Sequence, residues 1–580
     1  MFILMLLIYK EGLIMRVRNR LIILAMSIGI FLCMLDTTVM NVALPAIQSS
    51  LAVHLDKLSW ALNIYTILFA TLTIPLSKLA ERWGINKTYI VGLLIFISSS
   101  MISAVAQNLL SLIIGRAGQS IGAAIVFPLS LTIGISSVDL AARKGVIAVL
   151  GITQGLASAL GPTIGGCVTQ FWSWRWIFII NIPLSLFSLL ICFLGLTLNE
   201  TKQKEPLDLW GSLLSMITLF AFTLGLVQGR AWGWHSETII GLFITALVAL
   251  ILFIICESQS QHPMVPLALF GNQEFTGAAI TIVCSNLFLV AVTVILPTYF
   301  TKIQNKTELT AAFLITPITG MIFIFSPLAA VFIDQLGARR VLAIGFLLMT
   351  GSFWLFSTIN MKNLTLVIIS CLILGMGYGI ITGPITVLAA SDFQGTLLNA
   401  SQSVAGVLRQ IGISLAIAIY VSGLYGNLVT ARTQSTQYIQ AEVSTLKIPM
   451  AKKQLLTHKS LQALSHHSSK TTTNYFTVQD KQQIVQAQYI KSLQQQPQDL
   501  SPDRQQQLHQ HIQIQVEHKL TKINRQINTV IHKIHRFATR QYDQAFAKLY
   551  RASVIFVFLS TLSCLLFPAK KVTPEPSRSK

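Results

Sequence analysis

The chain has 580 residues, of which 53% are hydrophobic and only 11% are charged, and its formal net charge is +21. Soluble domains carry about 25% charged residues, so this composition excludes an ordinary soluble enzyme or binding domain. The apolar stretches have the length of spanning helices, roughly 20 residues, and lack the short alternation of barrel strands. The sequence therefore predicts an all-α membrane protein.

Neither the cysteines nor the charge indicates a further class. All seven cysteines lie in apolar stretches and none is spaced as a Cys-x-x-Cys pair, so no disulfide framework, metal site or cofactor is expected. The segment 427–548 has 16 basic and 6 acidic residues, which is about half of the positive excess and no sign of nucleic-acid binding. Met1–Tyr9 lacks the basic start and the cleavage site of a secretory signal, and Met15 would be an equally natural first residue.

Fourteen stretches are long and apolar enough to cross a membrane. They lie near 21–44, 59–79, 88–106, 110–136, 145–170, 174–197, 208–229, 237–256, 272–300, 309–333, 339–357, 364–388, 400–425 and 549–567. An even number of spans places both termini on one side, and the short loops on that side carry most of the basic loop residues. Because basic short loops stay in the cytoplasm, we expect a multi-pass protein of the cytoplasmic (inner) membrane with both termini inside.

The spans define the expected organisation of the chain as two six-helix halves with two extra helices between them. In order, we expect a cytoplasmic N-terminus (1–19), a six-helix half (20–200), two linker helices (201–260), helices 9–13 (261–426), an extracytoplasmic segment (427–548), the last span (549–568) and a cytoplasmic tail (569–580).

A weak internal repeat supports the two similar halves. The turn after the second span reads Glu81-Arg82-Trp83-Gly84-Ile85-Asn86-Lys87, and the turn after the tenth reads Asp334-Gln335-Leu336-Gly337-Ala338-Arg339-Arg340. In both, an acid stands three residues before a Gly that permits a tight turn, and basic residues that can pair with the acid follow. We expect two cytoplasmic gating turns formed by Glu81, Arg82, Gly84, Asp334, Gly337 and Arg339. The alternative is that any short cytoplasmic loop collects Gly and Arg.

The segment 427–548 is polar and rich in Gln and His. Its first part, to about Pro502, has no sustained period, so we expect it to be loose or partly helical. In its second part, apolar residues recur at alternating spacings of four and three, which predicts an amphipathic helix over about 508–548 that continues into the last span. The stripe consists of Val516, Leu520, Ile523, Ile527, Val530, Ile534 and Phe537. Its partner would be the earlier half folded back, a second copy, or another protein.

Asp36, Arg116 and Arg409 are ionisable residues inside predicted spans, where charges are costly and are functional candidates. Asp36 follows fifteen mostly apolar residues, and a carboxylate desolvated there can bind and release a proton. Arg116 in the fourth span and Arg409 in the thirteenth cannot lose their charge, so each needs an acid, carbonyls or water, and each is a candidate for proton coupling. The alternatives are a structural pair or a hydrogen bond to a Thr for Asp36, and snorkelling to the membrane surface for the arginines.

The stretch 155–183 combines small residues with a proline inside an apolar run. Gly161, Gly165 and Gly166 leave a shallow groove that lets another helix approach closely, and Pro162 kinks its own helix. We expect a packed, bent helix at a moving interface. A tight contact without motion is the alternative.

No catalytic signature occurs: the sequence has no HExxH, GxSxG, Walker or dinucleotide motif, so we expect no enzyme, and any pumping must use an ion gradient. Ordered motifs occur at 35–45, around Arg116, and at 157–166, 174–183, 229–234 and 272–275. They resemble those of the major facilitator superfamily, and specifically of its fourteen-span branch of drug:proton antiporters. Within 157–166, the pairs Gly161-Pro162 and Gly165-Gly166 resemble the antiporter motif of the fifth helix in that branch. The cytoplasmic turn departs from the family at Ser77, Glu81 and Ile85, where Gly, Asp and a basic residue are usual.

The resemblance implies proton-coupled efflux of amphipathic drug-like molecules, with two halves that rock around a central cavity. It also implies protons and a small molecule as partners, no nucleic acid, and for some members a periplasmic adaptor and an outer-membrane channel. Export of one dedicated metabolite, siderophore or peptide is an alternative within the same class. A non-transporting membrane scaffold or receptor is the alternative from another class, which the three intramembrane charges disfavour.

Overall fold

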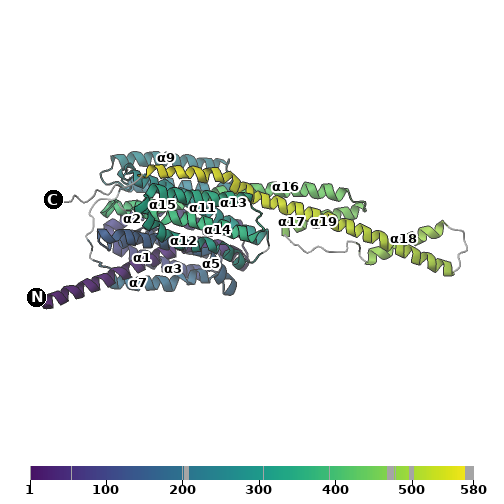
Figure 1. Ribbon diagram of the computed structural model, residues 1–580, viewed down its shortest axis with the longest axis horizontal. Helices are drawn as coiled ribbons and strands as arrows, with labels where there is room; N and C mark the ends of the chain where they lie inside the picture. Colours follow the sequence, from purple (N-terminus) through teal and green to yellow (C-terminus); the bar gives the residue numbers. More distant parts are fainter. Residues whose placement is uncertain are drawn as a thin grey trace. The chain divides into compact units, whose positions relative to one another are not determined.

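The structure, a computed structural model, describes residues 2–53, 55–198, 200, 208–304, 306–390, 392–466, 476, 478–495 and 502–568. Every regular element within these residues is a helix (Figure 1). The chain divides into two compact units, Met1–Gly423 with Ala547–Lys580, and Leu424–Phe546. The expected tail (569–580) and the first residues of the expected linker (201–207) lie outside the described residues.

The first unit is the apolar part of the chain. Its helices are α1 (Phe2–Leu51), α2 (Leu55–Trp83), α3 (Ile85–Ala104), α4 (Leu109–Ser136), α5 (Leu140–Phe171), α6 (Trp176–Ile179), α7 (Asn181–Gly195), α8 (Leu209–Trp232), α9 (Glu237–Gln259), α10 (Ala268–Gly271), α11 (Gln273–Lys302), α12 (Glu308–Leu336), α13 (Ala338–Thr358), α14 (Leu364–Leu388), α15 (Gly395–Ala416) and the π-helical turn η1 (Ile417–Val421). The end of α19 (Pro502–Ser560) and the 3-10 helix η2 (Thr561–Leu566) complete it.

Thirteen helices of the described chain are long and apolar enough to cross a membrane, and the bent α5 makes a fourteenth if it counts as one span. Each of the fourteen stretches expected from the sequence coincides with one of these helices. Two helices run well beyond the expected spans: α1 begins at Phe2, and α15 continues through η1 and α16 (Ser422–Ser444).

The bend in α5 has a local cause. The two parts of the helix, Gly145–Ala157 and Leu160–Phe171, meet at an angle of 44°. Pro162 follows the break, and a proline ring clashes with the carbonyl four residues earlier, here that of Ser158. The kink expected from Pro162 is therefore present, about one turn before the proline itself.

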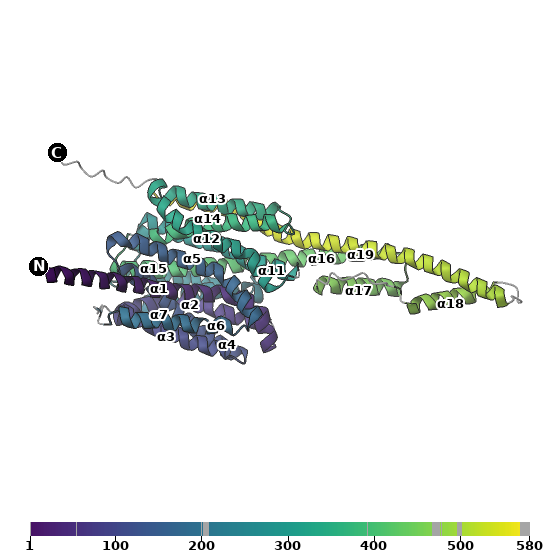
Figure 2. The same cartoon turned by 60° about the horizontal axis from the view of Figure 1, so that its bottom comes forward.

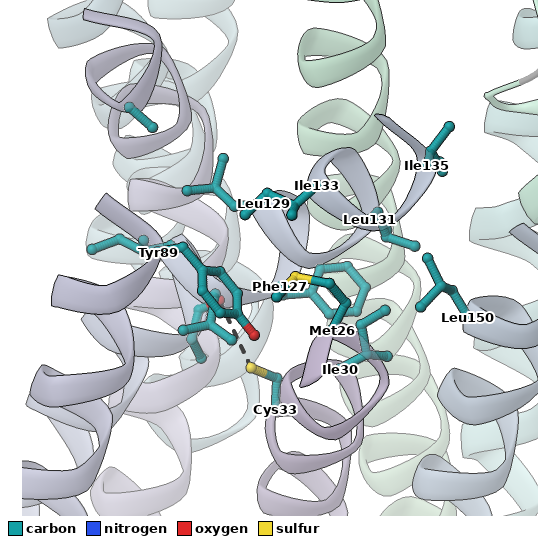
Figure 3. Close-up of a cluster of buried hydrophobic side chains, with 14 of the residues drawn as sticks. Met26, Ile30, Cys33, Tyr89, Phe127, Leu129, Leu131, Ile133, Ile135 and Leu150 are labelled. Atoms are coloured by element: carbon teal, nitrogen blue, oxygen red, sulfur yellow. Dashed lines mark hydrogen bonds between the residues drawn. The ribbon is translucent and has the colours of Figure 1, made fainter. Parts of the chain in front are cut away.

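The spans form two groups that meet along α2, α5, α12 and α15. Figure 2 shows α12, α13 and α14 on one side of the bundle and α3, α4 and α7 on the other. Between the groups, α2 packs against α15, and α5 packs against α12 and α14. Figure 3 shows part of the main core, a buried cluster that includes Met26, Ile30 and Cys33 of α1, Tyr89 of α3 and Phe127 of α4.

Both turns of the internal repeat depend on their glycines. Gly84 joins α2 to α3 with φ of 108°, and Gly337 joins α12 to α13 with φ of 82°. Side chains with a Cβ avoid this region of backbone space, so the glycine lets one helix follow another without a longer loop. The side chain of Asp334 lies outside the described ones, and Arg82 is exposed.

The second unit is a separate helical assembly of α16, α17 (Met450–His466), α18 (Val478–Gln494) and the long first part of α19. Its first part is more helical than the sequence indicated. The apolar stripe of α19 has its partner within the chain, because Ile527, Val530 and Ile534 pack with Ile439 and Leu456. Nearer its start, Val516 and Leu520 pack with Val485 of α18. The helices α16–α18 have few apolar residues of their own, so their order comes from this packing.

Candidate functional site

Asp36 lies in α1 at the centre of a buried polar cluster. Its side chain is 0% exposed. Arg116 of α4 donates from Nη1 to Oδ2 and forms an ion pair with it. The other oxygen, Oδ1, accepts from Nε2 of Gln119 at 3.2 Å and from Nδ2 of Asn181 at 3.3 Å. Residues from α4 and the first turn of α7 thus satisfy both oxygens of this carboxylate of α1 in the interior of the bundle.

Arg116 is also buried, with 1% of its surface exposed. Its Nε donates to the carbonyl of Ala61 at 3.2 Å, and its guanidinium lies over the ring of Tyr65 at 4.3 Å and that of Phe178 at 5.9 Å. Snorkelling is therefore wrong for Arg116. Removing one partner of such a buried pair costs about 3–5 kcal/mol because the remaining charge stays buried.

Small residues on α4 let α3 come close enough to complete this cluster. A Cβ on Gly115 would collide with the side chain of Ser103, and one on Gly118 would collide with Ser99. The close approach places Ser100 and Ser103 beside Gln119, whose Nε2 donates to Ser100 at 2.9 Å and whose Oε1 accepts from Ser103 at 3.3 Å. The amide that orients Asp36 is thus itself oriented by α3.

The small-residue stretch 157–166 of α5 packs directly against α1, the helix that carries Asp36. A Cβ on Gly161 would collide with the side chain of Thr38, and one on Gly165 would lie 2.8 Å from the carbonyl oxygen of Val39. Thr38 and Val39 follow Asp36 by two and three residues. The groove expected from the small residues therefore exists, and it is occupied by α1. Pro162 and Gly166 are both buried beside this contact.

A second polar cluster joins α2 to α15 where α2 ends, at the first repeat turn; we call it the α2–α15 clasp. Asn399 of α15 donates to Oε1 of Glu81 at 2.8 Å and to the carbonyl of Ser77 at 3.1 Å. Ser403 donates to the hydroxyl of Ser77, and Thr132 of α4 donates to Oδ1 of Asn399 at 3.2 Å. The clasp binds the two groups of helices together at this end of the bundle.

Glu81 thus acts differently from the expected pairing across helix ends. It forms an ion pair at 2.9 Å with Lys78, one turn earlier on its own helix, and bonds Asn399 on the other group. Sequence reasoning missed Asn399, because nothing in its local pattern says that it faces Glu81. Ser77, noted as a departure from the family, is part of the same clasp.

The first repeat turn has a further support that the sequence did not indicate. Glu200, after α7, accepts from the backbone N–H groups of Ile85 and Asn86 at 2.9 and 2.7 Å. The first N–H groups of a helix have no acceptor within the helix, and Gly84, which precedes α3, has no side chain to cap them. Burial raises the pKa of Glu200 above its ordinary value, and the two N–H donors and Lys87 oppose that rise.

Arg409 is in a different setting from Arg116. It is 5% exposed, so it does not snorkel to the surface. No described carboxylate forms an ion pair with it within 4 Å, and its guanidinium lies 5.5 Å from the ring of Phe127 on α4. The expectation that it resembles Arg116 holds for burial only.

The spanning helices in two groups, with an internal ion pair and a polar clasp between the groups, describe a multi-pass membrane protein. The model of the Major Facilitator Superfamily matches residues 26–417, and the chain belongs to that family. This family and the relatives of the chain indicate a transporter rather than an enzyme.

Relatives and a solved structure agree with this assignment. The chain is 28% identical over 429 residues to the multidrug transporter protein MdtP of Bacillus subtilis, covering 73% of this chain and 78% of that protein. It is 29% identical over 411 residues to the multidrug resistance protein Stp of Mycobacterium tuberculosis, covering 70% and 75%. Its fold is similar to that of the human organic anion transporter MFSD10, with a TM-score of 0.50, 12% identity, and coverage of 69% and 94%.

Proposed function

We propose that this protein is a proton-coupled exporter of amphipathic drug-like molecules in the cytoplasmic membrane, of the fourteen-span drug:proton antiporter branch. The observation that carries the proposal is the buried Asp36–Arg116 pair. A scaffold gains nothing from two charges placed in the interior of its spanning helices, where they are expensive. The names of the relatives, several of them multidrug or antibiotic resistance proteins, support the same substrate class.

In this mechanism protonation and rearrangement of the first group of helices are linked. When Asp36 takes up a proton, it loses its charge, and Arg116 becomes an uncompensated cation in a dry site. Arg116 must then turn toward other acceptors or water, which disturbs its contacts with α2 at Ala61 and Tyr65. Because α5 lies against α1 just beyond Asp36, the change reaches a helix that packs on α12 and α14.

The α2–α15 clasp is the cytoplasmic gate in this proposal. If both termini are cytoplasmic, as we propose, the first repeat turn and the clasp lie on that side, and the contacts of the clasp are those of a state closed there. Opening toward the cytoplasm requires Asn399 to leave Ser77 and Glu81. The proton then enters from outside and leaves inside as the substrate moves out.

The driving force is adequate for concentrative export. Each elementary charge that moves through 100 mV gains about 2.3 kcal/mol. Exchange of one proton for one neutral molecule then supports a gradient of roughly fiftyfold, since 1.4 kcal/mol is tenfold in an equilibrium constant.

The test is transport by Asp36→Asn protein in proteoliposomes with an imposed pH gradient and a pH-sensitive dye. Asn keeps the shape and can still hydrogen-bond, so we expect folded protein that has lost proton-coupled efflux. Asp392→Asn is the matched control, because Asp392 lies in the loop between α14 and α15 and bonds Asn272 at the surface. Full proton-coupled efflux by the Asp36 variant would remove this residue from the mechanism.

A dedicated exporter of one metabolite is the second candidate, and it is favoured by one relative. The chain is 27% identical over 408 residues to the riboflavin transporter RibZ of Clostridioides difficile. A substrate panel in inverted vesicles separates the two, because a dedicated exporter moves one member of the panel and a multidrug exporter moves many.

The extracytoplasmic segment is not needed for flux in this proposal. Its apolar stripe is already covered by α16, α17 and α18, so it needs no adaptor protein to shield it. Deleting 430–545 should leave proton-driven transport in vesicles, whereas a scaffold whose function lies in this segment would lose everything.

A further inference from the structure

Arg409 is a buried cation with which no described acid forms an ion pair. It lies on α15 in the membrane-spanning part of the chain, is almost fully buried, and its Nε has no hydrogen-bond partner among the described residues. A buried charge is normally paired, because an isolated one loses its hydration without compensation. A buried Arg without an acidic partner therefore needs a reason.

Gln410, the next residue, also has buried polar atoms that lack a hydrogen-bond partner among the described residues. Gln410 is 0% exposed, and both Oε1 and Nε2 of its side chain lack a partner. The hydroxyl of Ser414, one turn further along α15, also lacks one. Native structures leave few buried polar groups unsatisfied. Arg409 Nε, both amide atoms of Gln410 and the hydroxyl of Ser414 thus lie buried on one stretch of helix without a described hydrogen-bond partner, an arrangement that fits the binding of a polar ligand group.

The neighbouring surface of α4 and α2 is aromatic. The guanidinium of Arg409 faces the ring of Phe127. Phe127 contacts Phe69 with ring centroids 5.9 Å apart, and Phe69 contacts Tyr65 at 6.0 Å. The ring of Tyr65 in turn lies against the guanidinium of Arg116. A row of three rings therefore connects the unpaired cation of α15 with the paired cation of α4.

Arg409 also lies at the boundary that transport must open. It belongs to the second group of helices, whereas Phe127 and Phe69 belong to the first. Any separation of α15 from α4 and α2 exposes the guanidinium together with an aromatic wall. Guanidinium is the side-chain group best suited to carboxylate, sulfonate and phosphate oxygens, because its donors form a planar fork.

We infer that Arg409, with Gln410 beside it, is the point at which the transporter recognises an anionic group on an amphipathic substrate whose rings lie against Phe127 and Phe69. This inference rests on the proposed export function and specifies its substrate class. It gives Arg409 a role in substrate recognition instead of the proton coupling suggested by its position in a span.

The test is a binding measurement with two probes that share a ring system and differ in charge. The anionic probe is 8-anilino-1-naphthalenesulfonate and the neutral one is N-phenyl-1-naphthylamine. Both are measured by equilibrium dialysis against the full-length protein in nanodiscs of zwitterionic lipid, with empty nanodiscs subtracted. No proton gradient is present, so the result is independent of whether Asp36 couples transport to protons.

Arg409→Gln should weaken binding of the sulfonate by about ten- to hundredfold, the range for a hydrogen bond to a charged group, and leave the neutral probe unchanged. Arg409→Lys keeps the charge and should recover part of the sulfonate affinity, which a folding defect would not do. Lys362→Gln, in the exposed loop between α13 and α14, is the control and should change neither probe.

Three results would overturn the inference. One is wild-type protein that binds the sulfonate no better than the neutral probe. Another is Arg409→Gln protein that binds both probes as the wild type does. The third is an equal loss of both probes in Arg409→Gln and Arg409→Lys, which would make Arg409 a packing residue.

Discussion

The contact between α5 and α1 offers a test in which a single added methyl group decides between two opposite effects. Replacing Gly by Ala in a helix interior gains about 1 kcal/mol in helix propensity. At Gly161, however, the new Cβ would collide with the side chain of Thr38 and lie only 2.7 Å from its Cβ and 3.2 Å from the amide nitrogen of Val39. A rotation of Thr38 cannot move its Cβ, so α1 and α5 must separate.

Overpacking of this kind costs typically about 1–3 kcal/mol, which cancels or exceeds the gain in propensity. Gly351 in α13 provides the matched control, because a Cβ there meets nothing within 4 Å and keeps the full gain. We expect Gly351→Ala to be slightly more stable than the wild type, and Gly161→Ala to be less stable than Gly351→Ala by about 1–3 kcal/mol.

The assay is thermal unfolding of the purified variants in one detergent, followed by fluorescence-detected size exclusion. Gly165→Ala should resemble Gly161→Ala, because its Cβ meets the carbonyl oxygen of Val39, which cannot rotate away. Equal midpoints for Gly161→Ala and Gly351→Ala would show that α5 does not need the glycine for its approach to α1, and would refute the reasoning.

Two further predictions concern the clasp and the second unit. Asn399→Ala removes two donated and two accepted hydrogen bonds between α15 and the helices α2 and α4, so the closed state should lose about 1–3 kcal/mol. The measurement is the labelling rate of a cysteine introduced at Ala400, beside the clasp, which should rise in the Asn399→Ala background. An unchanged labelling rate would exclude a gating role. Ile527→Ala should destabilise the second unit by about 2–5 kcal/mol because Ile527 is buried under α16 and α17, whereas Ile514→Ala, on the exposed side of α19, should not. The stability of both variants is measured as the loss of helical circular-dichroism signal on heating. Equal destabilisation by Ile527→Ala and Ile514→Ala would contradict the assignment of Ile527 to the buried apolar stripe of α19.

The sequence alone determined the helical part of this fold. Lipid requires about 20 apolar residues for each span and internal hydrogen bonds throughout, so the positions of the spans can be read from composition. The tight turns at Gly84 and Gly337 followed from the one residue that tolerates a positive φ. The stripe of α19 followed from its period, although which segment covers it did not, and the structure assigns that role to α16, α17 and α18.

Which polar groups meet depends on how the helices pack. Asp36 and Arg116 were both candidates from the sequence, yet Gln119, Asn181 and the row of rings from Tyr65 to Phe127 emerge only when four helices are packed together. Asn399 and Glu200 bond residues more than 100 positions away, so no local pattern points to either. Arg116 and Arg409 look alike in sequence because each is a lone Arg in an apolar span. They differ in the fold because Asp36 on α1 pairs with Arg116, whereas no described acid pairs with Arg409. Helix packing sets which helices face each other, and a single sequence does not reveal that packing.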